Sequence, residues 1–78
     1  MSNEAIEAVV EAAWRQILQT DHVADGDNFF ELGGDSMSAL EFIDTVRRAT
    51  SCELSLQAVF KNGTLGAVKN ACVTGATH

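Results

Sequence analysis

Residues 27–40 read Asp-Asn-Phe-Phe-Glu-Leu-Gly-Gly-Asp-Ser-Met-Ser-Ala-Leu, and this stretch predicts the junction between a long polar loop and a helix. Two consecutive glycines end the loop, and Asp35 is well placed to cap a helix that begins at Ser36. Ser38 and Glu41 also match a capping box, which leaves open a start two residues later. In either case we expect Ser36 at the exposed beginning of the helix, beside small neighbours.

The helix predicted over residues 36–49 has an apolar face and an outward face of mixed character. At about 100° per residue, the apolar face comprises Ala39, Phe42, Ile43 and Val46. Met37 points away from this face, and Leu40 lies on its flank. A Met and a Leu on an outward face beside a glycine-rich turn are typical of a contact surface. We therefore expect a partner surface made of Met37, Leu40, Glu41, Asp44 and Arg48.

Residues 4–19 predict an amphipathic helix before the loop, with Ser2 or Asn3 as its cap. Trp14 lies within its apolar stripe, which is more typical of a core anchor than of a ligand platform. The complete stripe comprises Ile6, Val9, Val10, Ala13, Trp14 and Ile17.

The loop over residues 20–35 is long for so small a domain. Loops of this kind are usually functional or held in place by their own side chains. We expect Phe29 and Phe30 to hold it against the core, with Val23 and Leu32 as further apolar anchors.

Two more helices are predicted after residue 49. A short one is indicated within residues 50–63 by the apolar residues Leu54, Leu56, Val59 and Phe60. Thr64 then caps a last helix, and a frayed tail begins at Thr74. The expected fold is all-α: one domain over residues 1–78, ordered over about 4–73, with three main helices, one short helix and a long first loop.

The composition restricts the possible functions. The chain has 78 residues, with 11 acidic and 5 basic side chains and a formal net charge of -6. A domain of this size is stable by roughly 4–12 kcal/mol, which leaves little to support an enclosed polar active site. Ten of the acidic residues and one basic residue lie in residues 1–45. The excess of acid argues against nucleic acid and anionic membranes as partners.

The two cysteines, Cys52 and Cys72, form no disulfide framework or zinc motif. We expect them to be buried as small apolar residues. The N-terminus lacks the pattern of a signal peptide, and no apolar run is long enough to span a bilayer. These features predict a soluble protein in the reducing cytoplasm, and we further expect it to be a monomer.

The central stretch can be compared with three kinds of chemical site. A calcium loop fails because Val23 and Leu32 stand where oxygen ligands are needed. A serine hydrolase fails because Ser36 lacks both the glycine that follows in a nucleophile elbow and a nearby histidine. Two interpretations stay open on the residues alone: Ser36 accepts a phosphorylated group near the positive end of a helix dipole, or it belongs to an ordinary capped helix start.

The stretch Asn28-Phe29-Phe30-Glu31-Leu32-Gly33-Gly34-Asp35-Ser36, followed by Met37, resembles the attachment region of phosphopantetheine-dependent carrier proteins. The likeness extends in length and helix order over about residues 4–73. Two glycines before Asp35 resemble the peptidyl (aminoacyl) carriers of nonribosomal peptide synthesis more than fatty-acid or polyketide acyl carriers. One departure is Lys61-Asn62-Gly63-Thr64, where many such domains have a His-Pro-Thr turn.

The resemblance implies that Ser36 carries a 4'-phosphopantetheine arm derived from coenzyme A, with Gly33, Gly34 and Asp35 presenting it. A phosphopantetheinyl transferase would attach the arm, whose thiol would hold aminoacyl or peptidyl groups as thioesters. Adenylation, condensation, tailoring and thioesterase enzymes would then be the partners of a carrier that is not itself an enzyme. The alternatives are an acyl carrier for polyketide or fatty-acid chains and an unmodified helical interaction module.

Overall fold

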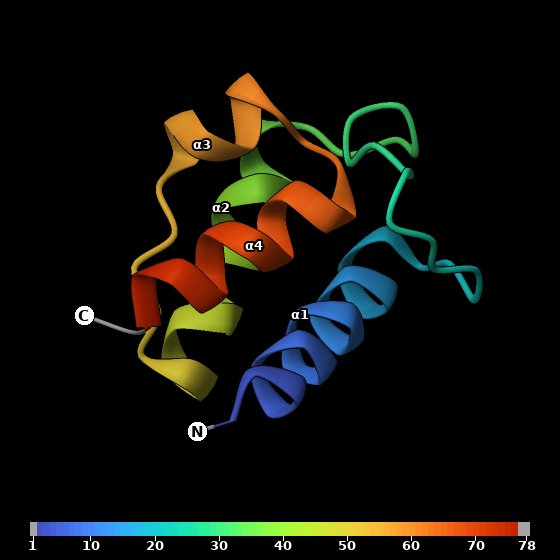
Figure 1. Cartoon of the computed structure of the whole chain (residues 1–78). Helices are drawn as coiled ribbons and strands as arrows, with labels where there is room; N and C mark the ends of the chain where they lie inside the picture. The colour runs from blue at the N-terminus through green and yellow to red at the C-terminus, as the bar shows by residue number, and fades with distance from the viewer. Residues whose placement is uncertain (1, 77–78) are drawn as a thin grey trace.

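The computed structural model describes residues 2–76 and contains four helices (Figure 1). Their bounds are Asn3–Leu18 for α1, Ser36–Thr50 for α2, Leu56–Lys61 for α3 and Leu65–Ala76 for α4. Within the described residues, β-structure is limited to one isolated bridge between Asn28 and Thr64. The predicted all-α fold with three longer helices and one short helix is confirmed.

The structure decides between the alternative caps of the first two helices. Ser2 caps α1, because its Oγ accepts a hydrogen bond of 3.2 Å from the amide three residues later. Asp35 caps α2, because its Oδ1 accepts a hydrogen bond of 2.9 Å from the Ser38 amide. The start two residues later is therefore wrong, and α2 begins at Ser36.

The last two helices also begin at polar caps. The Ser55 Oγ accepts from the Ala58 amide at 3.1 Å, and the predicted cap Thr64 accepts from the Ala67 amide at 3.4 Å. Residues 74–76 belong to α4, although we expected the ordered part to end near residue 73. Residues 1 and 77–78 lie outside the described part of the chain, and so does the end of the predicted tail. No described helix is long and apolar enough to cross a membrane.

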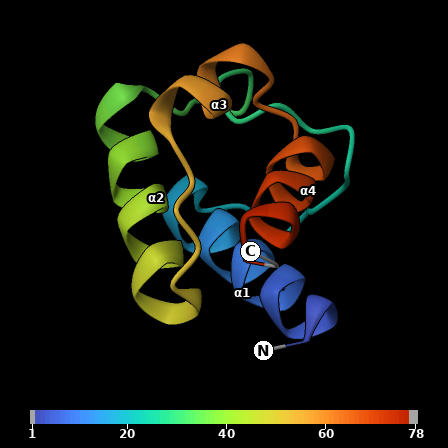
Figure 2. The same cartoon turned by 60° about the vertical axis from the view of Figure 1, so that its left-hand side comes forward.

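The core lies where α1 packs against α2 and α4, and α3 bridges α2 and α4 at one end of the bundle (Figure 2). Trp14, the predicted anchor, is fully buried in edge-on contact with Phe29 and Phe42, at centroid distances of 5.5 and 5.9 Å. We call these three residues the aromatic centre. The other buried apolar side chains are Ile6, Val10, Ala13, Ala39, Val46, Cys52, Leu54, Val59, Leu65, Val68 and Cys72.

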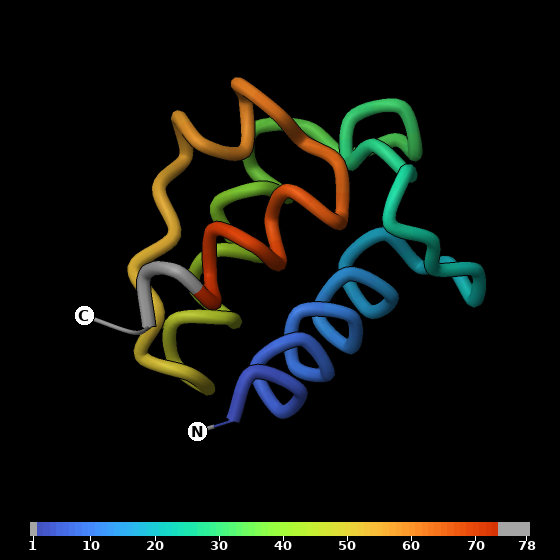
Figure 3. The backbone as a smooth tube through the Cα atoms, in the orientation of Figure 1, coloured from blue at the N-terminus to red at the C-terminus, as the bar shows by residue number. Residues whose placement is uncertain are grey.

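The long loop is held by fewer side chains than predicted. Phe29 is fully buried, and Val23 and Phe30 pack against the core while partly exposed. Leu32 is 41% exposed, so its assignment as an anchor is wrong. The reason is a tight turn in which the Leu32 amide donates to the carbonyl of Asn28, which leaves Leu32 on the outside. Figure 3 shows the path of the loop from α1, past the start of α4, to the start of α2.

The apolar residues that indicated the short helix α3 are not all buried. Leu54 and Val59 are buried and Leu56 is partly buried, as expected for its apolar stretch. Phe60, in contrast, is 51% exposed. Its ring stacks on Phe30 at 5.0 Å with an interplanar angle of 5°, so the loop rather than the core supplies its contact.

Candidate functional site

Ser36 is the first residue of α2 and is exposed. The start of α2 lies at the end of the bundle where α3 is found (Figures 1 and 2). The described part of the chain has no pocket, so the Ser36 hydroxyl is offered on an open surface. An open position permits a reaction inside the active site of another protein, which a recessed serine would not permit.

The two glycines before Asp35 are required for different reasons. Gly33 has φ +101°, a conformation that L side chains rarely adopt. Gly34 lies against the aromatic centre: a Cβ there would overlap the Phe29 ring and approach the Phe29 carbonyl oxygen at 2.8 Å. The Gly34 amide donates to the same carbonyl at 3.0 Å. The path of the chain into Ser36 is therefore set by Phe29 and by the absence of side chains at the glycines.

The carboxylate of Asp35 is directed back onto the first turn of α2. Its pKa lies below the ordinary value because it accepts hydrogen bonds from Ser38, first of all from the backbone amide. A carboxylate with a lowered pKa is a weak proton acceptor near neutral pH. Asp35 is therefore better suited to fixing the helix start than to activating the Ser36 hydroxyl.

The five residues of the predicted partner surface lie at spacings that place them along one side of α2. Met37 is 73% and Leu40 is 53% exposed, which agrees with their expected outward orientation. Glu41 is also exposed. Asp44 forms ion pairs with Arg47 at 3.0 Å and with Arg48 at 2.8 Å, so its charge is compensated within the helix.

Two further exposed apolar residues were missed by the sequence analysis. Leu32 and Phe60 complete the set of large exposed hydrophobic side chains in the described chain, together with Met37 and Leu40. Phe60 was counted among the apolar residues of the short helix with no side assigned to it, because a helix of six residues is too short for periodicity to define its buried side. Leu32 lies in a loop, where no periodic signal exists.

A family model for the phosphopantetheine attachment site matches residues 8–72. Malpinin synthetase of Mortierella alpina is 35% identical over 75 residues, which are 95% of this chain and 1% of that protein. Tyrocidine synthase 3 of Brevibacillus parabrevis is 37% identical over 60 residues, which are 77% of this chain and 1% of the synthetase. Bacitracin synthase 2 of Bacillus licheniformis is 39% identical over 51 residues, 65% of this chain and 2% of that protein. The chain thus spans a very small part of these relatives.

Solved structures give the same assignment. An active-site mutant of a peptidyl carrier protein has a TM-score of 0.86 and 28% identity, covering 95% of this chain and 82% of that one. A peptidyl carrier protein in complex with the phosphopantetheine transferase Sfp and coenzyme A has a TM-score of 0.82 and 28% identity. The match covers 88% of this chain and 90% of that one. The chain therefore belongs to the phosphopantetheine attachment-site family, and the solved structures that it resembles are peptidyl carrier proteins.

Proposed function

We propose that Ser36 is the attachment residue for 4'-phosphopantetheine and that this chain is a non-catalytic carrier. The observation that supports this most strongly is the exposed hydroxyl at the start of α2, reached through two glycines, within the segment that the family model matches. The bound group supplies a terminal thiol that holds an aminoacyl or peptidyl group as a thioester.

The residues around Ser36 fit a phosphate ester. The first turn of a helix carries unsatisfied amide groups and the positive end of the helix dipole, both of which favour a negatively charged phosphate. Gly33 and Gly34 contribute no side chain that would obstruct a transferase, and Met37 is turned outward. The chain provides position and electrostatic environment, and the enzyme that attaches the group provides the catalysis.

The two thiols of the chain itself are unsuited to carrying an acyl group. Cys52 is 1% and Cys72 is 0% exposed. Burial, together with a hydrogen bond to Cys52, raises the pKa of the Cys72 thiol to about 12. Because the thiolate is the nucleophile, such a thiol does not accept an acyl group at neutral pH. A carrier built on this chain therefore needs the thiol of an attached arm. The free cysteines also support a reducing compartment such as the cytoplasm.

The partners are proposed to be a phosphopantetheinyl transferase and adenylation, condensation, tailoring or thioesterase enzymes. Met37, Leu40 and Glu41 would contact them, with Asp44 and Arg48 at the far end of the same surface. Since most acidic residues lie in residues 1–45, we expect basic surfaces on at least some partners and weaker binding at high salt.

The test is intact-mass spectrometry after incubation with coenzyme A and a broad-specificity transferase. We expect the wild type to gain the mass of one phosphopantetheine group and Ser36→Ala to gain none. Ser38→Ala is the matched control, because it removes a hydroxyl one residue beyond Met37, and it should be modified like the wild type. An unmodified wild type, or a modified Ser36→Ala, would contradict the proposal and favour an unmodified interaction module.

A further inference from the structure

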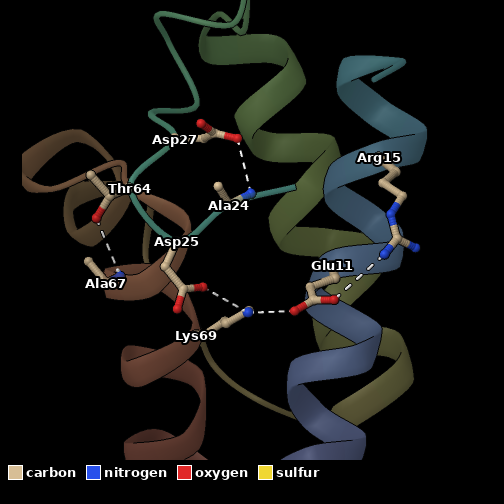
Figure 4. Close-up of polar contacts among 8 residues, drawn as sticks. All are labelled: Glu11, Arg15, Ala24, Asp25, Asp27, Thr64, Ala67 and Lys69. Atoms are coloured by element: carbon tan, nitrogen blue, oxygen red, sulfur yellow. Dashed lines mark hydrogen bonds and ion pairs between the residues drawn. The ribbon is translucent and has the colours of Figure 1, made fainter. Parts of the chain in front are cut away.

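Lys69 of α4 connects three parts of the chain that are distant in sequence. Its side chain is only 13% exposed, and its Nζ lies between the carboxylates of Glu11 on α1 and Asp25 in the long loop (Figure 4). The distance from Nζ to the Asp25 Oδ1 is 2.9 Å. The hydrogen bond to Glu11 and then that to Asp25 raise the pKa of Lys69, against the opposing effect of burial. The ammonium group is therefore charged at neutral pH.

The contact with Asp25 lies at one end of a series of backbone hydrogen bonds between the loop and the junction of α3 with α4. The Gly66 amide donates to the Asp25 carbonyl at 2.9 Å, and the Leu65 amide donates to the Asp27 carbonyl at 2.9 Å. The Phe29 amide then donates to a carbonyl of the junction at 2.8 Å. Gly66 permits the close approach, because a Cβ there would lie 3.3 Å from the Asp25 Cβ. Residues 25–29 are thus aligned along residues 63–66.

This alignment leads directly to Ser36. Phe29 is the last residue of the series. Its carbonyl accepts a hydrogen bond from the Gly34 amide, and its ring packs against the Gly34 backbone. Asp35 follows and caps α2. A displacement of the loop at Asp25 can therefore reach the attachment residue through a continuous set of backbone hydrogen bonds and one ring contact.

We propose that Lys69 is a positioning residue for the modification of Ser36: it holds the loop at Asp25 and so keeps Gly34 and Ser36 in the arrangement that a transferase binds. This rests on the proposed attachment at Ser36. Asp25 is the exposed member of the ion pair, with 72% of its side chain accessible, and Lys69 is the shielded one. Without the ion pair between Lys69 and Asp25, a fraction of the molecules should have the loop in an arrangement that the transferase does not bind, while the helical bundle stays folded.

A population shift has a kinetic signature of its own. When only a fraction of the carrier is competent, the apparent affinity falls by that fraction while the bound complex reacts as before. We therefore expect the KM of the transferase for the carrier to rise about two- to fivefold in Lys69→Met, while kcat stays unchanged. A change in KM of this size corresponds to the free energy typical of a partly exposed ion pair. A general loss of stability in a protein that is still folded at the assay temperature leaves KM unchanged.

The experiment measures KM and kcat of the transferase for four carriers: wild type, Lys69→Met, Asp25→Asn and Arg15→Met. Asp25→Asn breaks the same pair at its exposed member, so it stays informative if Lys69→Met does not fold. Arg15→Met is the matched control. It removes the other cation that pairs with Glu11, whose Oε1 lies 3.6 Å from the Arg15 Nη2, and it leaves the ion pair between Lys69 and Asp25 in place. Lys69→Arg should restore most of the wild-type KM.

Amide hydrogen exchange gives a second measurement that does not depend on the transferase. In Lys69→Met, the amides of Phe29, Gly34 and Gly66 should exchange faster, and those in the middle of α1 should not. Wild-type KM and exchange in both loop variants would overturn the inference while leaving attachment at Ser36 intact. An unmodified wild type would instead overturn the proposed function.

Discussion

Two parts of the long loop are held in different ways. At its end near α2, Gly34 lies against the buried ring of Phe29, where no side chain can be accommodated. Nearer its middle, beside the start of α4, Asp25 is held by backbone hydrogen bonds and by an ion pair whose acidic member is largely exposed. The first contact is steric and resists change, whereas the second is electrostatic and can be weakened by degrees. Ser36 thus follows the sterically fixed end of a loop whose middle is held by a contact that can be weakened.

The comparison predicts its largest effect at Gly34. Gly34→Ala places a methyl group into the Phe29 ring, and overpacking of this kind costs about 1–3 kcal/mol. Urea denaturation should show this loss in the free energy of unfolding. Gly26→Ala in the same loop is the control, because a Cβ there meets nothing within 4 Å, and it should be close to neutral. Equal stability of the two variants would contradict the steric account.

A smaller loss of stability is expected at Asp35. Asp35→Ala removes the hydrogen bond that the Ser38 amide donates to the Asp35 carboxylate. It should lower the Tm by less than Gly34→Ala does, because losing an exposed helix cap does not disturb the packing of the core. Scanning calorimetry measures this. Asp35→Asn should recover part of the loss, since an amide oxygen also accepts the hydrogen bond. A Tm of Asp35→Ala equal to that of the wild type would show that the cap is not needed.

The same cap gives a pH dependence of definite sign. The pKa of Asp35 is lowered in the folded chain relative to the ordinary value of 3.8. Its contribution to stability is therefore present above that pH and is lost as the pH falls through the folded pKa. The difference in unfolding free energy between wild type and Asp35→Asn should shrink on acidification from neutral pH to below 3.8. A difference independent of pH would exclude this role for the carboxylate.

The smallest effect on stability is expected at the outward face of α2. Met37→Glu should change the free energy of unfolding by no more than about 0.5 kcal/mol, because Met37 is 73% exposed. The same variant should impair at least one partner step, measured as thioester formation with an adenylation enzyme. A large loss of stability would contradict the outward position of Met37. Unchanged thioester formation would show that Met37 does not belong to the surface that contacts the adenylation enzyme.

The sequence was most informative where residues act locally. The caps Asp35 and Thr64 and the anchor Trp14 were predicted from spacing and side-chain chemistry, and the structure confirms them. Leu32 was wrongly predicted to anchor the loop, and no side was assigned to Phe60, because neither a loop nor a helix of six residues has enough periodicity to define an inner side.

Contacts between distant segments were beyond the reach of the sequence. Lys69 and Asp25 are 44 residues apart, and nothing in either segment indicates the other. The pairing of residues 25–29 with 63–66 uses backbone groups, which every residue except proline carries in the same form. The resemblance identified Gly34 as important, but only the structure relates it to the Phe29 ring.

The central claim, attachment at Ser36, is tested most directly by site-resolved mass spectrometry of the modified protein. Cleavage after basic residues gives the peptide of residues 16–47, which contains both Ser36 and Ser38. Fragment ions that break the chain on either side of Met37 separate the two serines. We predict that the whole added mass of the phosphopantetheine group lies on Ser36. Added mass on Ser38, or on a peptide outside residues 16–47, would contradict the account.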